Sequence, residues 1–388
     1  MLYIGRDAKT EEPIYIDASR SRAVLICGKR GSGKSYTLGV IVEELFELAD
    51  TLIVIIDTMG IFHTMALPNI QQEKELWSWG IGAKGFPIKL LVPGEPEVRY
   101  GSHEVIAELN RRGIYIEPFR LNPGDLSPDG WCEFLELSIN EVMGIALYRA
   151  AQALSRKRKK FFILSELIDQ IAQDSRSPER TKEALINRLE WAIDIDIFST
   201  SYQELWEVFD LQAINVIDLS VLDPSRYGLR SLILAVLARD LFNKRAIARR
   251  KEELNISSDL PKVWLAIDEA HQFAPAGRSA LSKDALIRWV KEGRQPGLSV
   301  ALASQQPAAI DNEIISQCDI ILSHKLTNVE DIQAVNKLSQ DYMATELRTL
   351  IRSLNRRGEA VLVDDEREQV NMVQIRPRRS HHGGGESK

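Results

Sequence analysis

The sequence has few cysteines and no long apolar run. Its three cysteines, Cys27, Cys132 and Cys318, lie far apart and lack the spacing of metal ligands. No apolar stretch approaches the length of a membrane-spanning helix, and the N-terminus lacks the pattern of a secretory signal peptide. These absences are typical of a protein with reduced thiols and no membrane partner. We therefore expect a cytoplasmic location.

The sequence also lacks an excess of positive charge. Its 49 lysines and arginines are outnumbered by 55 aspartates and glutamates, which gives a formal net charge of −6. Nucleic-acid-binding domains are usually basic, so this balance disfavours such a partner, although a local ring of positive charge is sufficient for binding. No basic stretch is interleaved with aromatic residues, so a duplex backbone fits better than stacked single-stranded bases.

Residues 24–45 contain the strongest motif of the chain. An apolar run, Val-Leu-Ile-Cys, leads into Gly-Lys-Arg-Gly-Ser-Gly-Lys-Ser at 28–35, and a helical pattern follows from Tyr36 to Leu45. Strand, glycine-rich loop and helix in this order predict a phosphate-binding loop, whose backbone N–H groups and helix dipole point at one anion. The alternative, a glycine-rich turn with an incidental lysine, does not account for the flanking strand and helix.

This loop predicts binding of a nucleoside triphosphate, and we expect ATP with Mg²⁺. Lys34 can reach the β- and γ-phosphates, and Ser35 can ligate the magnesium ion. The residues of this segment that we expect to bind ATP are Gly28, Gly31, Ser32, Gly33, Lys34, Ser35 and Tyr36.

Two further apolar runs end in carboxylates. Residues 52–57 predict a buried parallel strand with Asp57 at its carboxyl end, the edge where α/β sheets bind ligands. Asp57 would lie near the magnesium ion or the attacking water; the alternative is an aspartate that caps a helix or turn. Residues 263–267 predict a second strand, followed by Asp268 and Glu269. Asp268 would hold Mg²⁺, directly or through water, and Glu269 would orient and deprotonate the attacking water.

Residues 298–305 predict another strand, and it ends in Gln305. A polar amide at this position can sense the γ-phosphate and pass the signal onward; the alternative is an ordinary polar loop residue. Further strands are predicted at 88–92, 114–116, 213–219, 320–324 and 359–364.

We expect an α/β fold whose core is interrupted by helices. The core would consist of residues 1–124 and 200–388, which contain the predicted strands. Residues 125–199 instead carry apolar residues at three- and four-residue steps, and these predict an inserted helical bundle with one long helical stretch over 131–154. The basic residues after 375 are expected to form a disordered end.

Three basic clusters are candidates for contacts with DNA phosphates. The densest, in the helical insertion, is Arg156, Lys157, Arg158, Lys159 and Lys160; the others are Arg111 with Arg112, and Arg376 with Arg378 and Arg379. Lining the pore of a ring, such a cluster would be multiplied by the number of subunits and would make binding steeply salt-dependent. The alternative is a solvated helix face.

Taken in order, the motifs resemble the HerA branch of the HerA/FtsK ATPases, prokaryotic motors that act on double-stranded DNA. The resemblance covers most of the chain from about residue 20 onward. Besides the phosphate loop, it rests on Ile-Ile-Asp-Thr-Met-Gly at 55–60, Leu-Ala-Ile-Asp-Glu-Ala-His at 265–271, Lys-Glu-Gly-Arg at 291–294, Ala-Ser-Gln-Gln-Pro-Ala-Ala-Ile-Asp at 303–311 and Ile-Arg-Pro-Arg-Arg-Ser-His-His-Gly-Gly at 375–384.

The resemblance implies a RecA-like P-loop NTPase core, a hexameric ring and ATP sites at the subunit interfaces. It also implies that Arg294 is an arginine finger from the neighbouring subunit, since a guanidinium can neutralise charge that develops on the transferred phosphoryl group. The alternative for Arg294 is a surface or ion-paired arginine. Arg22 would be a second basic residue near the nucleotide.

Two departures from the family pattern affect the expected partners. Family members usually carry an N-terminal β-barrel that helps to hold the ring and to dock a partner nuclease of NurA type. Only about twenty residues precede the first predicted strand here, so we expect the barrel to be missing. At the end of the strand predicted over 298–305, the family often has Gln-Arg-Pro, and here the residues are Gln305-Gln306-Pro307.

We expect an ATP-hydrolysing, ring-forming motor that translocates on or unwinds double-stranded DNA. The alternative is an ATPase motor that acts on a protein substrate, as in secretion or conjugation complexes, and the acidic balance and the missing barrel favour it. A nucleotide-gated regulatory module is disfavoured, because a pure switch has no need of a water-activating carboxylate such as Glu269.

Overall fold

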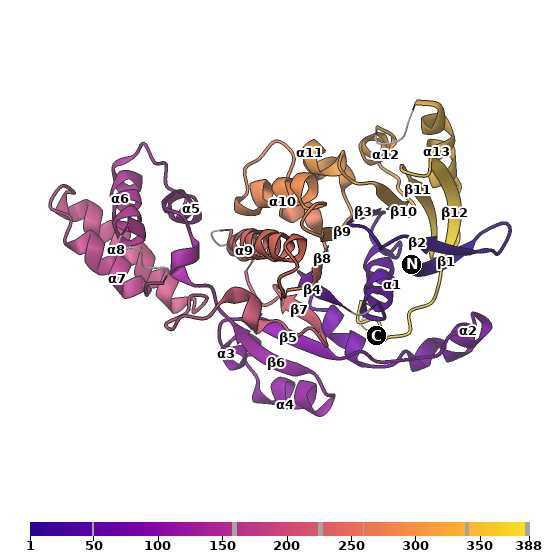
Figure 1. Cartoon of the computed structure of the whole chain (residues 1–388), viewed down its shortest axis with the longest axis horizontal. Helices are drawn as coiled ribbons and strands as arrows, with labels where there is room; N and C mark the ends of the chain where they lie inside the picture. Colours follow the sequence, from indigo (N-terminus) through magenta and orange to yellow (C-terminus); the bar gives the residue numbers. More distant parts are fainter. Residues whose placement is uncertain (49, 157–160, 224–227, 259, 338–340, 385–388) are drawn as a thin grey trace.

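The computed structural model describes residues 1–48, 50–156, 161–223, 228–258, 260–337 and 341–384, with only the backbone for 341–346. One twelve-stranded sheet runs through the molecule, and helices pack on both of its faces (Figure 1). Within the described residues, no helix combines the length and apolar composition needed to cross a bilayer.

The strand order is β2-β1-β12-β11-β10-β3-β9-β8-β4-β7-β5-β6. Neighbours from β10 to β6 are parallel, whereas β10, β11, β12, β1 and β2 pair in antiparallel fashion. The predicted α/β class with a mainly parallel sheet is therefore confirmed. The strands are β1 (Leu2–Asp7), β2 (Pro13–Ile16), β3 (Ala23–Cys27), β4 (Thr51–Asp57), β5 (Ile88–Pro93), β6 (Tyr115–Phe119), β7 (Ile214–Asp218), β8 (Lys262–Ile267), β9 (Leu298–Ser304), β10 (Ile320–Ser323), β11 (Glu359–Asp364) and β12 (Gln369–Ile375).

The central strands are continuous apolar runs because helices cover both faces of the sheet. Successive side chains of β3 alternate between two cores: Val24 packs in the core that contains α1, and Leu25 packs in the core that contains α9 and α10. The helices outside residues 125–199 are α1 (Lys34–Phe46), α2 (Glu73–Ser78), α3 (Pro96–Tyr100), α4 (His103–Arg111), α9 (Leu229–Glu253), α10 (Leu281–Glu292), α11 (Asn312–Ile315), α12 (Val329–Asn336) and α13 (Asp341–Ser353).

The order of the central strands positions the functional site. β9 lies between β3 and β8, and all three run in the same direction. Their carboxyl ends therefore meet at one edge of the sheet, where parallel α/β proteins bind ligands. The phosphate loop, Asp268 and Gln305 each follow one of these three strands directly.

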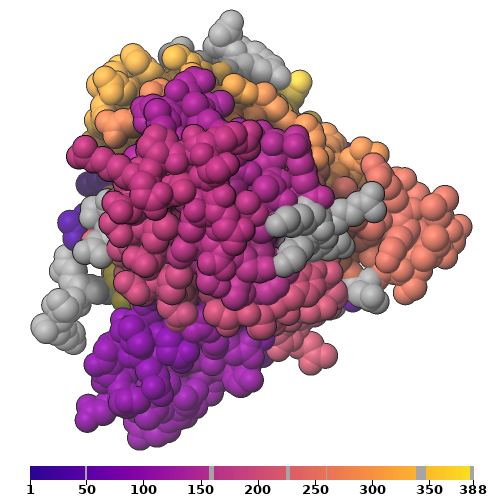
Figure 2. Space-filling model, turned by 90° about the vertical axis from the view of Figure 1, so that its left-hand side faces the viewer, coloured from indigo at the N-terminus to yellow at the C-terminus, as the bar shows by residue number. Residues whose placement is uncertain are grey.

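Helices α5 to α8 pack on one another and project from the left of the sheet in Figure 1. They are α5 (Pro128–Phe134), α6 (Val142–Arg156), α7 (Leu164–Ala172) and α8 (Glu179–Asp194). Figure 2 faces this projection, which covers much of that side of the molecule. The chain enters and leaves it side by side, because Leu121 N–H donates to the Ile197 carbonyl and Ser199 N–H donates to the Leu121 carbonyl, each over 2.8 Å. We propose that residues 125–199 form an inserted unit within a core made of 1–124 and 200–388.

One predicted helical stretch is broken. The apolar spacing over 131–154 suggested continuous helix, but α5 ends at Phe134 and α6 begins at Val142. Glu136 has a left-handed backbone with φ of 54°, which a continuing right-handed helix cannot contain. Periodicity of apolar residues does not reveal such a turn.

The prediction of a disordered basic end after residue 375 is wrong for residues 376–384. β12 is part of the sheet, and the residues after it cross α1. Arg376 and Arg378 are fully buried and lie against Glu43 of α1, so they cannot contact DNA phosphates as predicted. A buried carboxylate requires such cationic partners, which explains why a basic segment folds inward.

Candidate nucleotide-binding and hydrolysis site

The phosphate loop joins β3 to the start of α1. Gly31 and Gly33 have φ of 74° and 110°, conformations that glycine adopts without strain, and Gly33 caps the helix. A Cβ atom on Gly28 would lie 2.6 Å from Cβ of His324, so only glycine fits there. The loop and the positive end of the 13-residue helix form the anion-binding cradle that the motif predicts.

His324 packs against Gly28 of this loop and contacts Thr37 of α1. No sequence motif indicated this role. Its side chain is fully buried. Its Nδ1 lies 2.9 Å from the Glu359 carbonyl, which can only accept, so Nδ1 carries the proton and Nε2 accepts from Thr37 Oγ1 over 2.8 Å. Burial lowers the pKa of His324 to about 4, so the ring is neutral near pH 7.

Lys34 is 5% exposed and its Nζ donates to the Lys29 carbonyl over 3.2 Å. Burial lowers the pKa of its ammonium group, and the nearby charges of Glu269 and Asp268 oppose that shift. Among the described residues, no carboxylate pairs with Nζ within 4.0 Å. The ammonium group is therefore available to a phosphate.

Ser35 and Asp268 form a pair that fits a magnesium ion. Ser35 Oγ donates to the two carboxylate oxygens of Asp268 over 3.1 and 3.3 Å. Asp268 is fully buried, and burial together with the charge of Glu269 raises its pKa to about 6. Two hard oxygen ligands beside a phosphate cradle suit Mg²⁺, which keeps several waters and needs few protein ligands.

Glu269 lies next to this pair in a strained conformation. Its φ of 53° is left-handed, which costs a residue other than glycine about 1–2 kcal/mol, and the residue is 5% exposed. Its Oε1 accepts a hydrogen bond from Gln305 Nε2. Its Oε2 has no hydrogen-bond partner among the described residues, although His271 Nδ1 lies 3.4 Å away. The structure thus brings Gln305 to the predicted base and leaves one carboxylate oxygen ready to accept a proton.

Asp57 does not contact this cluster. Its Oδ1 accepts from the N–H groups of Met59 and Gly60 over 3.0 and 2.8 Å, and its Oδ2 accepts from Phe62 N–H over 2.8 Å. Burial, helped by the charge of Asp218, raises the pKa of Asp57 to about 7. These contacts are those of the turn-capping alternative. Because the charge of Asp268 also raises the pKa of Asp57, its position near the magnesium ion or the attacking water stays a prediction.

Comparison with known families places the chain. Residues 2–241, more than half of it, match the family described as the central domain of the HerA helicase. The chain belongs to this HerA family. The predicted HerA-type recognition is therefore confirmed, and with it the enzyme class of P-loop ATPase.

Curated HerA relatives are distant but align over most of the chain. The DNA double-strand break repair helicase HerA of Sulfolobus acidocaldarius is 24% identical over 350 residues, which are 88% of this chain and 62% of that protein. The protein of the same name from Pyrococcus furiosus is 24% identical over 369 residues, 88% of this chain and 63% of its own length. This chain thus spans somewhat under two thirds of these relatives.

Solved structures share the fold. VirB4 of Thermoanaerobacter pseudethanolicus superimposes with a TM-score of 0.58 at 14% identity and 96% coverage of both chains. The conjugative coupling protein TrwBdeltaN70 gives a TM-score of 0.53 at 11% identity, covering 98% of this chain and 91% of that one. The predicted RecA-like P-loop NTPase fold is confirmed by these similarities.

In this HerA-family chain, Arg22 and Arg294 lie away from the chain's own phosphate loop. Both precede strands of the central sheet, whereas Lys34 follows the carboxyl end of β3. Arg22 is buried in ion pairs with Asp319 at 2.8 Å and Glu366 at 2.5 Å. The Arg294 side chain is 71% exposed, 3.7 Å from Glu366. Because β9 alone spans about 20 Å, neither side chain reaches the nucleotide site of the same chain.

The remaining predicted residues are Tyr36, expected to bind ATP, and the basic residues expected to contact DNA. The Tyr36 hydroxyl donates to Gln72 Oε1 over 2.9 Å and accepts from Arg378 N–H over 2.6 Å, so it holds the C-terminal segment against α1. Arg156 is exposed at the end of α6, and the predicted DNA contacts at 157–160 lie outside the described residues. Arg111 and Arg112 are exposed but pair with Glu108 at 2.5 and 2.7 Å.

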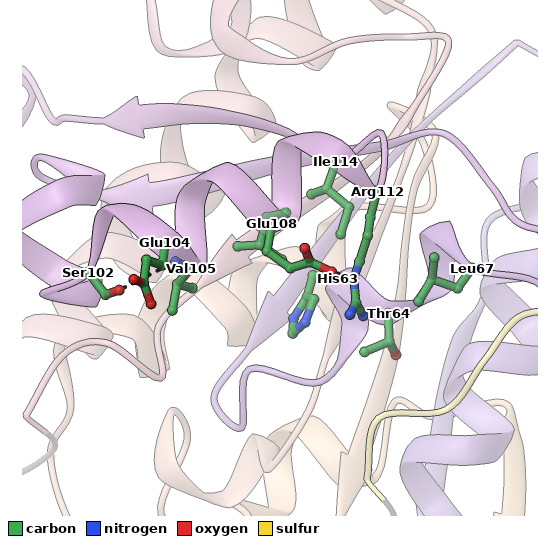
Figure 3. Close-up of a pocket in the computed structure, with 10 residues that line it drawn as sticks. His63, Thr64, Leu67, Ser102, Glu104, Val105, Glu108, Arg112 and Ile114 are labelled. Carbon is green, nitrogen blue, oxygen red and sulfur yellow. Dashed lines mark hydrogen bonds and ion pairs between the residues drawn. The ribbon is translucent and has the colours of Figure 1, made fainter.

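A separate groove lies between α4 and the short helix η1 (Phe62–Ala66), with a volume of about 320 Å³. In Figure 3, Glu108 of α4 and Arg112, which directly follows α4, point toward His63. None of the residues predicted to bind ATP lines this groove. The nucleotide site is therefore assigned by its chemistry and not by the volume of a cavity.

Proposed function

We propose that this chain is the ATPase subunit of a ring-forming motor that moves double-stranded DNA. The observation that carries the proposal is the meeting of Lys34, Ser35, Asp268, Glu269 and Gln305 at the carboxyl ends of β3, β8 and β9. Phosphate cradle, metal ligands and a carboxylate base are the parts that phosphoryl transfer to water requires.

Each residue has a defined part in this chemistry. The loop N–H groups and Lys34 bind the β- and γ-phosphates, and Ser35 with Asp268 would hold Mg²⁺, which supplies positive charge to the phosphate oxygens. Glu269 accepts the proton of the attacking water at its carboxylate. Gln305 fixes the Glu269 carboxylate through its amide and so links the γ-phosphate site to the end of β9.

The exposed position of Arg294 supports a site shared between copies of the chain. It is too far from its own phosphate loop, and an exposed guanidinium can enter the site of an adjacent copy. We propose a hexameric ring, the assembly that the family resemblance implies, with double-stranded DNA in its pore. A nuclease of NurA type is the partner that the same resemblance implies.

A protein substrate is the second candidate function. The net charge is −6, and one of the three predicted DNA-contact clusters is buried through Arg376 and Arg378. Both observations reduce the positive charge available to a DNA backbone.

Mixing two inactive variants tests the shared site. Lys34→Ala should lose nucleotide binding, and Arg294→Ala should hydrolyse ATP at least about a hundredfold more slowly because the transition-state charge is unopposed. Mixed before assembly, the two variants should regain hydrolysis, since an intact loop then meets an intact Arg294. Full activity of Arg294→Ala alone, or no gain on mixing, would contradict the shared site.

A further inference from the structure

A second cationic site lies at the edge of the sheet opposite the phosphate loop. It is a pocket of about 260 Å³ beside the amino ends of β3, β8 and β9, closed by the last turns of α9. Five cationic side chains and one carboxylate, Glu252, are among its lining residues: Arg20, Arg245, Arg249, Lys262 and Arg294. The same three strands thus carry the phosphate loop at one end and a basic pocket at the other.

Arg245 gives this pocket a buried cationic wall. It is 2% exposed, and its Nη1 and Nη2 lie 2.8 and 2.9 Å from the carboxylate oxygens of Glu252. Its Nε has no hydrogen-bond partner among the described residues. Gly297 packs on the guanidinium, because a Cβ atom there would lie 3.4 Å from Nη2. The buried arginine therefore retains an unsatisfied donor, which is costly without a ligand.

The other cationic groups are anchored but remain accessible. Arg249 is 43% exposed, and its Nε lies 3.1 Å from Glu253. Lys262 Nζ donates to the Ser19 carbonyl over 3.1 Å. Glu366 lies 3.0 Å from Arg20 and 3.7 Å from Arg294, so it holds these two side chains at the mouth of the pocket. Like charges gathered in this way favour a multiply charged anion.

We propose that this pocket receives the terminal phosphates of the nucleotide bound to the phosphate loop of a neighbouring copy. Arg249 and Lys262 then act together with Arg294 on those phosphates. The inference rests on the shared site proposed above, and it adds two side chains that no sequence motif singled out. Guanidinium forks bind phosphate oxygens bidentately, so a cluster of arginines both attracts and orients the group.

The test uses the fact that the two kinds of copy in the mixed assembly supply different halves of each active interface. In a mixture of Lys34→Ala and Arg294→Ala copies, only the Lys34→Ala copies supply an intact basic pocket, and only the Arg294→Ala copies hold ATP. Arg249→Ala added to the Lys34→Ala copies should lower the regained ATP hydrolysis by about tenfold or more, the effect of one lost charge-assisted contact. Added to the Arg294→Ala copies, it should leave the regained rate unchanged.

The controls separate this inference from its alternatives. Arg250→Ala, an exposed neighbour on α9 outside the pocket, should change nothing when placed in the Lys34→Ala copies. Lys262→Ala, like Arg249→Ala, should lower the regained rate when placed in the Lys34→Ala copies and leave it unchanged when placed in the Arg294→Ala copies. If Arg249→Ala lowered the regained rate equally in either kind of copy, its role would be structural or in binding the DNA backbone, and the inference would be overturned. An unchanged rate with Arg249→Ala in the Lys34→Ala copies would also overturn it. No regained activity in the starting mixture would instead contradict the shared site itself.

Discussion

At the residue scale, Glu269 combines a strained backbone, burial and a carboxylate oxygen without a hydrogen-bond partner among the described residues. Strain of this kind persists only where the surrounding structure enforces it, and it concentrates at catalytic groups. Gln305 fixes the other oxygen of the same carboxylate. The arrangement fits the general base that the sequence predicts at this position.

Glu269→Gln should therefore separate binding from hydrolysis. The amide keeps the shape of the side chain but cannot accept the proton, so the steady-state rate of ATP hydrolysis should fall by about 10²–10⁴-fold. Binding of ATP, measured by calorimetry on the same preparation, should persist. Glu292→Gln, an exposed glutamate on α10, is the matched control and should hydrolyse normally. Normal turnover of Glu269→Gln would show that another group is the base.

His324 should make the fold sensitive to acid. The folded-state pKa is about 4 and the ordinary value is 6.5, so below pH 6.5 the unfolded chain binds a proton that the folded chain excludes. The free energy of unfolding should therefore decrease by about 3 kcal/mol as the pH falls from 6.5 to 4. Denaturant unfolding of the chain and of His324→Gln across this range checks it. The stability difference between them should shrink toward pH 4, and a constant difference would contradict the assignment.

At the scale of elements, the segment after β12 fixes helix α1 through a buried network. Arg376 Nη1 lies 2.9 Å from Glu43, and Ser380 donates to the same carboxylate through its N–H and its hydroxyl over 2.8 and 2.6 Å. Because α1 begins at the phosphate loop, this network connects the end of the described chain to the nucleotide site.

Loss of one partner from this network should destabilise the fold. Arg376→Ala leaves Glu43 buried without its closest cation, and should lower the free energy of unfolding by about 3 kcal/mol or more. Arg379→Ala removes a partly exposed pair with Glu47 and should cost no more than about 1 kcal/mol. Equal effects in denaturant unfolding would show that the buried pair contributes no more than a surface one.

The sequence predicts the elements that carry their own local pattern. The apolar runs before Gly28, Asp268 and Gln305 are strands, and their carboxyl ends meet because parallel strands share an edge. Interactions between distant segments leave no such pattern. Two examples are the packing of His324 against the loop and the burial of Arg376 against Glu43. Both depend on contacts between residues that lie hundreds of positions apart in the sequence. The turn at Glu136 and the capping contacts of Asp57 are local, but spacing alone does not distinguish them from helix or from a metal ligand.

At the scale of the whole molecule, the two edges of the sheet carry different charged groups. The carboxyl edge holds the phosphate loop with Asp268 and Glu269, and the amino edge holds Arg294 and the basic pocket. A nucleotide on the phosphate loop would add phosphate charge to the carboxyl edge, and the cations at the opposite edge then suit head-to-tail association, which closes into a ring when the rotation between copies allows it.

The most direct measurement is steady-state ATP hydrolysis with and without linear double-stranded DNA, at low and at moderate salt, with Lys34→Ala as the inactive control. A DNA motor should be stimulated by the duplex, and the stimulation should fade as salt rises because contacts with the phosphate backbone release counterions. Robust hydrolysis that is the same with and without DNA at both salt concentrations would contradict the DNA motor and favour a protein substrate.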